Sequence, residues 1–114
     1  LIINIESKPA IDSLDEILEI KDIDAILIGP HDLSCSLGIP EDYRNPLFDN
    51  AVRTIIRKAK ERGISAGIHY FWGLDQEISW AKEGLNMIIH SSDMVLFRDT
   101  LKRDLDAIKS ALKD

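Results

Sequence analysis

The chain has 114 residues, of which 45% are hydrophobic and 30% charged, a balance that suits one folded unit with a modest core. Its formal net charge of -6 and its lack of a Lys/Arg cluster exclude nucleic acid as the expected partner, because that partner needs a basic face. The single cysteine, Cys35, can form no internal disulfide, and no uncharged stretch reaches the roughly 18 residues of a membrane span. We therefore expect a cytoplasmic protein without nucleic-acid or membrane partners.

Strand and helix patterns alternate four times along the chain. The β-branched run at 1–5 predicts a strand, and the helical stripe at 9–20 predicts a helix that Pro9 opens. The same reasoning predicts strands at 24–29, 64–71 and 85–90, and helices around 51–62, over 74–84 and from Asp93, as N-cap, to Lys113. This alternation predicts a single α/β domain, residues 1–114, with a parallel sheet and right-handed crossovers.

Two architectures fit this order. A doubly wound open sheet of four or five strands matches the length, whereas a (β/α)₈ barrel takes about 250 residues, so that this chain supplies almost half of one. The chain opens directly on the strand pattern "LIINIE", without an initiator Met. We therefore expect a fragment that forms half of a barrel.

The stretch "IGPHDLSCSLG", residues 28–38, holds one acidic residue among small and polar neighbours. Asp32 follows the second predicted strand as Glu6 follows the first, 26 residues earlier, so the two belong at the same end of neighbouring strands. We expect their carboxylates to approach within roughly 3 to 5 Å, because one hard cation needs such a separation. This spacing predicts a magnesium or manganese site.

An ordinary alternative is that both acidic residues are helix caps. Glu6 would cap the helix that begins near Pro9, and Asp32 would cap a short helix at 33–36. A second pattern favours a ligand site, since Gly29 and Pro30 let the backbone pass close to a ligand. The amides that follow would then face an anion such as a substrate carboxylate.

Together, "IES", "IGPHDLSCSLG", "GIH" and "HSSD" at the strand ends resemble the C-terminal half of the HpcH/HpaI aldolase family, among the (β/α)₈ barrels of the phosphoenolpyruvate/pyruvate superfamily. The resemblance spans the whole chain. It implies that Glu6 and Asp32 bind the metal and that the backbone around Gly29, Pro30 and His31 holds the carboxylate of pyruvate or a related 2-oxo acid. Asn4 stands near the substrate, where the family often has the longer Gln.

The resemblance also implies a reaction, which is the metal-dependent (class II) cleavage or formation of 4-hydroxy-2-oxo acids from pyruvate and an aldehyde, without a Schiff-base lysine. The family's catalytic Arg and His belong to its N-terminal half, so we expect the catalytic residues outside this chain and no turnover by the fragment alone. The last helix resembles those that pack against a neighbouring subunit, which implies a homo-oligomer. The alternative function is a non-catalytic α/β binding domain in which Glu6 and Asp32 are caps only.

Other chemically notable residues receive structural interpretations. His69 and His90 end strands, but neither has a helical H-x-x-x-H or carboxylate partner in local spacing, so we interpret both as structural. Trp72 and Trp80 are assigned to packing. Cys35 lacks a basic neighbour other than His31, which argues against a reactive thiol.

Overall fold

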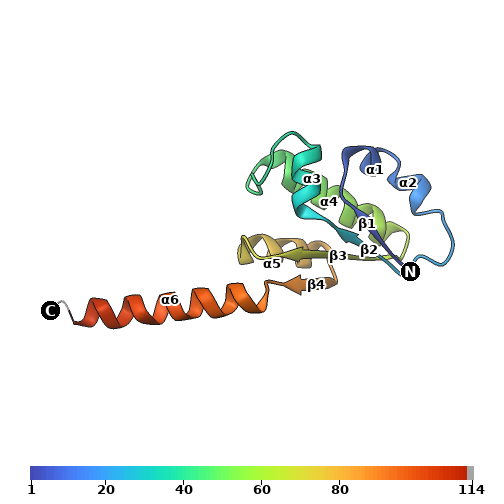
Figure 1. The fold of residues 1–114 in the computed structure, drawn as a ribbon. Helices are drawn as coiled ribbons and strands as arrows, with labels where there is room; N and C mark the ends of the chain where they lie inside the picture. Colours follow the sequence, from blue (N-terminus) through green and yellow to red (C-terminus); the bar gives the residue numbers. More distant parts are fainter. Residues whose placement is uncertain (113–114) are drawn as a thin grey trace.

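The computed structural model describes residues 1–112, which form a four-stranded parallel sheet with strand order β1-β2-β3-β4 (Figure 1). The elements follow one another as β1 (Ile2–Ile5), α1 (Lys8–Asp12), α2 (Leu14–Ile17), β2 (Ala25–Ile28), α3 (Pro30–Ser36), α4 (Pro46–Glu61), β3 (Ser65–Tyr70), α5 (Leu74–Glu83), β4 (Met87–His90) and α6 (Asp93–Ala111). The predicted order of strands and helices is thereby confirmed.

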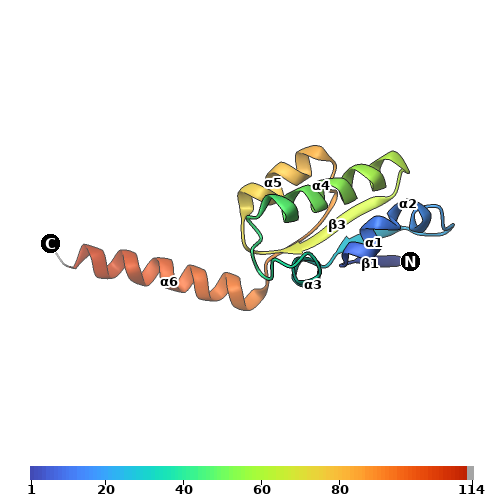
Figure 2. The ribbon, with the colours of Figure 1, turned by 90° about the horizontal axis from the view of Figure 1, so that it is seen from above.

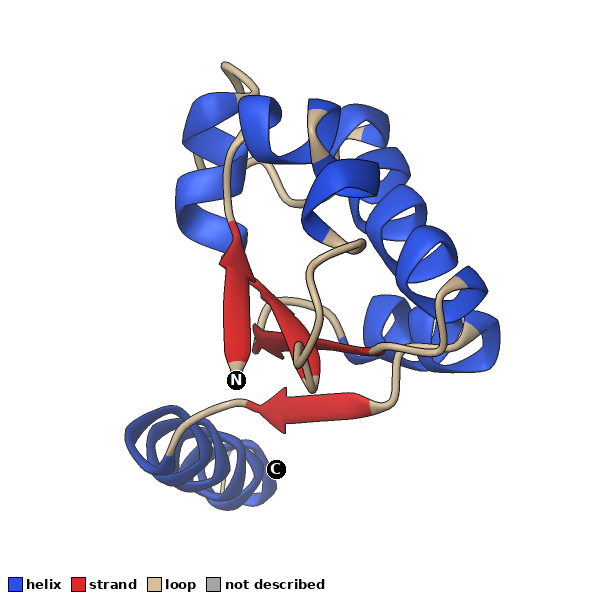
Figure 3. Cartoon of the chain, turned by 90° about the vertical axis from the view of Figure 1, so that its right-hand side faces the viewer, coloured by secondary structure: helices blue, strands red, loops and turns tan. Residues whose placement is uncertain are grey.

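Strand side chains alternate between two faces, and only one face is covered by helices. The residues on the covered face are buried in a core shared with helices α2, α3, α4 and α5, against which α1 packs partly buried side chains, and they include Ile5, Ile26, Ile28, Ile68 and Tyr70. Figure 3 shows these helices arching over one side of the twisted sheet. A doubly wound sheet has helices on both faces, so this arrangement is that of a barrel segment and the open-sheet alternative is wrong. The opposite face corresponds to the barrel interior.

The helix predicted at 9–20 is divided in the structure. Ser13 ends α1 and begins α2, with φ -96° and ψ 15°, outside the helical region. After this break, Leu14 and Leu18 point into the core, where both are buried. The single apolar stripe of the sequence therefore belongs to two short helices, α1 and α2.

Helix α6 stands apart from the rest of the chain, as Figures 1 and 2 show. It has no buried residue, and it extends the described part of the chain to 62 Å in its longest dimension. Its N-cap is Ser92, whose Oγ accepts from the Val95 amide at 3.4 Å, and not the predicted Asp93, which begins the first turn. The predicted end at Lys113 lies outside the described residues. None of the helices within residues 1–112 has the length and apolarity to cross a membrane.

Candidate functional site

The candidate site lies where β1 and β2 end. These strands are parallel neighbours with Ile5 paired to Ile28, so Glu6 stands beside Gly29 at the carboxyl edge of the sheet. Asp32 lies three residues further, in the first turn of α3. The fold thus places both acidic residues at the same end of adjacent strands. Their approach to within 3 to 5 Å stays a prediction.

Gly29 makes room for the side chain of Glu6. A Cβ atom on Gly29 would lie 2.6 Å from Oε2 and 2.8 Å from Cβ of Glu6, closer than atoms can pack. The φ angle of Gly29 is -89°, which any residue tolerates, so glycine is needed here for space and not for backbone conformation. The Glu6 carboxylate therefore leans across β2, above the start of the "GPHD" turn.

Neither carboxylate makes a capping hydrogen bond. The N-cap of α1 is Ser7, whose Oγ accepts from the Ala10 amide at 3.3 Å, and the N-cap of α3 is Gly29, which has no side chain. Asp32 gains only the general preference of the first helical turn for negative charge. Within residues 1–112, the side chains of Glu6 and Asp32 take part in no hydrogen bond or ion pair. Two acidic side chains at one edge are thus available to a cation.

The donor set suits a hard divalent cation of the magnesium or manganese type. Carboxylate oxygens are the preferred protein ligands of such ions, and two of them leave the remaining positions to water and to substrate oxygens. No group of three or more His, Cys, Asp or Glu side chains arranged for a metal occurs in the described part of the chain.

The residues predicted to hold the substrate surround this pair. Asn4 is exposed two positions before Glu6, and so shares its face of β1. Pro30 is buried at the start of α3, which fixes the turn that follows Gly29. The side chain of His31 is exposed, with Nδ1 3.6 Å from Oε1 of Glu41. The side chain of His31 is thus paired with Glu41, and a substrate contact of its backbone stays a prediction.

The remaining notable side chains pack or pair. Trp80 is buried, with its indole nitrogen donating to Oδ1 of Asp49 at 2.8 Å, whereas Trp72 is 39% exposed and stacks on Tyr43 with ring centroids 4.0 Å apart. Cys35 is an exposed free thiol. Its Sγ lies 4.0 Å from the His31 ring.

Sequence reasoning missed the buried acid Glu77. Its side chain is 3% exposed, and its Oε2 accepts from Nδ1 of His90 at 2.7 Å. The spacing of 13 residues crosses from α5 to β4, so no local motif connects the pair. Glu77 belongs by sequence to a helix with many polar residues, and only the packing of α5 on the sheet identifies it as buried.

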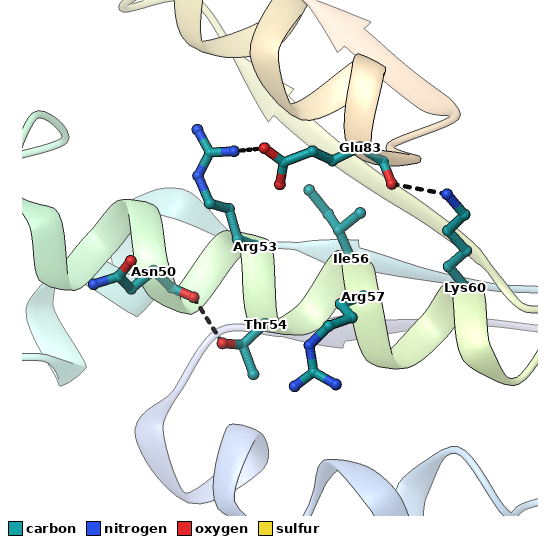
Figure 4. A pocket seen from close by; sticks show the side chains of 7 residues that line it. All are labelled: Asn50, Arg53, Thr54, Ile56, Arg57, Lys60 and Glu83. Carbon is teal, nitrogen blue, oxygen red and sulfur yellow. Dashed lines mark hydrogen bonds and ion pairs between the residues drawn. The ribbon is translucent and has the colours of Figure 1, made fainter.

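A groove on the outer helical layer lies away from this edge. It runs between α4 and α5 and is lined by Asn50, Arg53, Thr54, Ile56, Arg57, Lys60 and Glu83 (Figure 4). Its charges are largely paired, since Arg53 forms an ion pair with Glu83 and Lys60 donates to the Glu83 carbonyl at 3.3 Å. We therefore regard it as a seam between packed helices.

The parallel strand–helix units and the acidic carboxyl edge define a segment of a (β/α) barrel, the class in which sites form at the carboxyl ends of strands. Within that class, the chain belongs to the HpcH/HpaI aldolase/citrate lyase family, whose model matches residues 1–100. The resemblance found in the sequence is thereby confirmed.

Among curated relatives, a 2-keto-3-deoxy-L-rhamnonate aldolase of Escherichia coli (strain K12) is 36% identical over 115 residues, covering 96% of this chain and 41% of the relative. The crystal structure of an HpcH/HpaI aldolase from Desulfitobacterium hafniense DCB-2 matches with a TM-score of 0.84 at 25% identity, over 95% of this chain and 42% of that one. A family member from Burkholderia cenocepacia J2315 shares the fold with a TM-score of 0.87 at 24% identity, over the same shares. The chain thus spans about two-fifths of the length of these proteins.

Proposed function

We propose that residues 1–114 supply the metal-binding edge of a class II aldolase that cleaves or forms 4-hydroxy-2-oxo acids, with pyruvate and an aldehyde as the other reactants. The observation that carries this proposal is the pair Glu6 and Asp32, two carboxylates without protein partners at adjacent strand ends. Family membership and the aldolase from E. coli support the reaction class. A capping role for the pair has no supporting hydrogen bond.

Each residue of the edge has a distinct task in this proposal. Glu6 and Asp32 hold a magnesium or manganese ion, and Gly29 leaves the space in which the Glu6 carboxylate turns toward it. The backbone of Gly29, Pro30 and His31 orients the carboxylate of the 2-oxo acid beside the cation. When bound, the cation supplies positive charge where negative charge develops on the oxo group as the carbon–carbon bond breaks.

Asn4 lies within β1 and is the further side chain that we assign to the substrate site. It stands two residues before Glu6 on the face that corresponds to the barrel interior, so its amide faces the same space as the proposed ligand. We assign it the task of donating a hydrogen bond to the 2-oxo acid.

Metal binding can be tested on the chain itself. Titration with Mn²⁺, followed by electron paramagnetic resonance of the free ion, should show one site that Glu6→Gln or Asp32→Asn weakens at least tenfold. Glu16→Gln and Asp22→Asn are matched controls, because both residues are exposed. Equal binding by all five proteins would exclude the Glu6 and Asp32 site.

The reaction requires the rest of the barrel in this proposal. The chain should therefore be co-expressed with the part of the E. coli aldolase that it does not match, and pyruvate release from 2-keto-3-deoxy-L-rhamnonate measured. Asp32→Asn should lower turnover by orders of magnitude with an almost unchanged melting temperature, since Asn caps helices about as well as Asp. Near-normal turnover by this variant would leave Asp32 as a helix cap only.

We further propose that a second copy of this chain covers α6. The helix carries a row of exposed apolar side chains, namely Met94, Leu96, Phe97, Leu101, Leu105 and Ile108. Ile88 on the neighbouring strand β4 is also 43% exposed, although it lies on the face that the other strands bury against helices. Apolar surface of this extent is typical of a subunit interface.

A further inference from the structure

A third strand contributes to the carboxyl edge, and its residue there is His69. The register pairs Ile28 with Ile68, so the position after Ile68 lies beside Gly29, which itself lies beside Glu6. Since Ile68 and Tyr70 are both buried under the helices, His69 points to the opposite face, which it shares with Glu6. Across this face the edge therefore consists of a carboxylate, a glycine without a side chain, and an imidazole.

The orientation of the His69 ring is fixed by one hydrogen bond. Nε2 lies 2.9 Å from the carbonyl oxygen of Ser91, and because a carbonyl can only accept, Nε2 carries the proton. Ser91 is 6% exposed and has φ 60°, a left-handed conformation that is uncommon outside glycine. In the neutral ring Nδ1 is then a hydrogen-bond acceptor, and it has no protein partner within residues 1–112.

Glu6 and His69 stand two strands apart on the same face of the sheet. Neighbouring strands are about 4.8 Å apart, so the backbones of these two residues are separated by roughly 10 Å. Gly29 contributes no side chain to this interval, and the Glu6 side chain lies over Gly29, with Oε2 2.6 Å from the position that a Cβ on Gly29 would take. A molecule bound to the Glu6 carboxylate on its β3 side therefore has His69 as its next neighbour.

We propose that Nδ1 of His69 accepts a hydrogen bond from a hydroxyl group on C3 of the 2-oxo acid, so that the site prefers 3-hydroxylated 2-oxo acids to those with an unsubstituted C3. This inference rests on the proposed function, since it takes the 2-oxo acid to lie beside Glu6. His69 is then a specificity residue that contacts substrate. An apolar side chain at this position would instead favour a methyl group.

Pyruvate and hydroxypyruvate differ by one hydroxyl group and are suitable probes. Each is titrated calorimetrically into the Mg²⁺-saturated chain. We expect hydroxypyruvate to bind about tenfold more tightly than pyruvate, the value of one hydrogen bond of roughly 1.4 kcal/mol. His69→Leu should abolish this preference and leave Mg²⁺ affinity unchanged.

Two further variants separate the substrate contact from the bond to Ser91. Asn places an amide near the position of Nδ1, and Gln places one near Nε2. A substrate contact predicts that His69→Asn retains the preference for hydroxypyruvate and that His69→Gln loses it. His90→Asn is the control, because His90 lies on the other face of the sheet and should keep the preference.

The outcomes distinguish this inference from the proposed function. The role of His69 would be overturned, with the metal site left intact, if the unaltered chain bound the two acids equally. It would also be overturned if His69→Gln retained the preference for hydroxypyruvate and His69→Asn lost it. Loss of Mg²⁺ affinity in His69→Leu would also overturn it, because His69 would then be a ligand. Binding of neither acid by the Mg²⁺-saturated chain would overturn both.

Discussion

The substitution Gly29→Ala tests whether the position of the Glu6 carboxylate depends on the space that Gly29 leaves free. The backbone at Gly29 accepts alanine, but the new Cβ would lie 2.6 Å from Oε2 and 2.8 Å from Cβ of Glu6. The carboxylate oxygen can rotate away, whereas Cβ is fixed to the backbone, so β1 must also shift. Overpacking of this kind costs about 1–3 kcal/mol of unfolding free energy.

The same substitution should also weaken the metal site. Moving the Glu6 carboxylate removes one of two anionic ligands, so we expect Mn²⁺ affinity to fall at least tenfold, or roughly 1.4 kcal/mol. Urea unfolding and Mn²⁺ titration measure the two effects separately. Gly73→Ala is the control, because its Cβ would meet Arg44 and Gln76, far in the chain from Glu6, and should destabilise without changing Mn²⁺ affinity. Unchanged Mn²⁺ affinity in Gly29→Ala, alongside lost binding in Glu6→Gln, would refute this reasoning.

Three further predictions concern the rest of the fold. Burial raises the pKa of Tyr70 to about 12, so the contribution of Tyr70 to stability is complete below pH 10 and declines as the pH rises toward 12. In the unaltered chain the urea midpoint should fall over that pH range, and Tyr70→Phe should make this fall less steep. An equally steep fall in both proteins would contradict the prediction. His90→Leu should lower the unfolding free energy by about 1–3 kcal/mol because it leaves Glu77 buried without its donor, and His90→Asn should lose less. The chain should self-associate through α6 and its open strand edges. Sedimentation velocity should show smaller species for the double variant Leu101→Glu/Leu105→Glu, but not for the control Arg103→Glu. A monomeric unaltered chain would exclude this self-association.

The order of the fold was predictable because each element has a local signature. The apolar run before Gly29 predicts a strand and the stripe over 51–59 predicts an amphipathic helix, and the structure has β2 and α4 there. In β2, Ile26 and Ile28 are buried under the helices, whereas Leu27 on the open face is only half-buried. The break at Ser13 was not predictable, since the stripe continues through it and only packing decides where Leu14 points. The choice between Ser92 and Asp93 as N-cap likewise depends on backbone angles, because both residue types are good caps.

The candidate site was predictable to the level of strand ends. Glu6 and Asp32 could be assigned to one edge because their spacing equals one strand–helix unit. The reason for Gly29 was only partly anticipated, since the sequence indicates close approach but not that the Glu6 side chain occupies the space. The surroundings of His69 could not be predicted from the sequence. They depend on the register of β2 with β3 and on the hydrogen bond to the Ser91 carbonyl after β4, and tertiary pairing sets both.

The sequential strand order has a consequence for how this chain folds. Each strand pairs with the strand next to it in the chain, and the connecting segments 6–24, 29–64 and 71–86 contain 19, 36 and 16 residues. Closing loops of this length costs little more entropy than closing shorter ones, because the cost grows only with the logarithm of length. We therefore expect the three strand pairings to form with similar ease and in no fixed order. Folding can then proceed through neighbouring contacts alone, without waiting for the two ends of the sheet to meet.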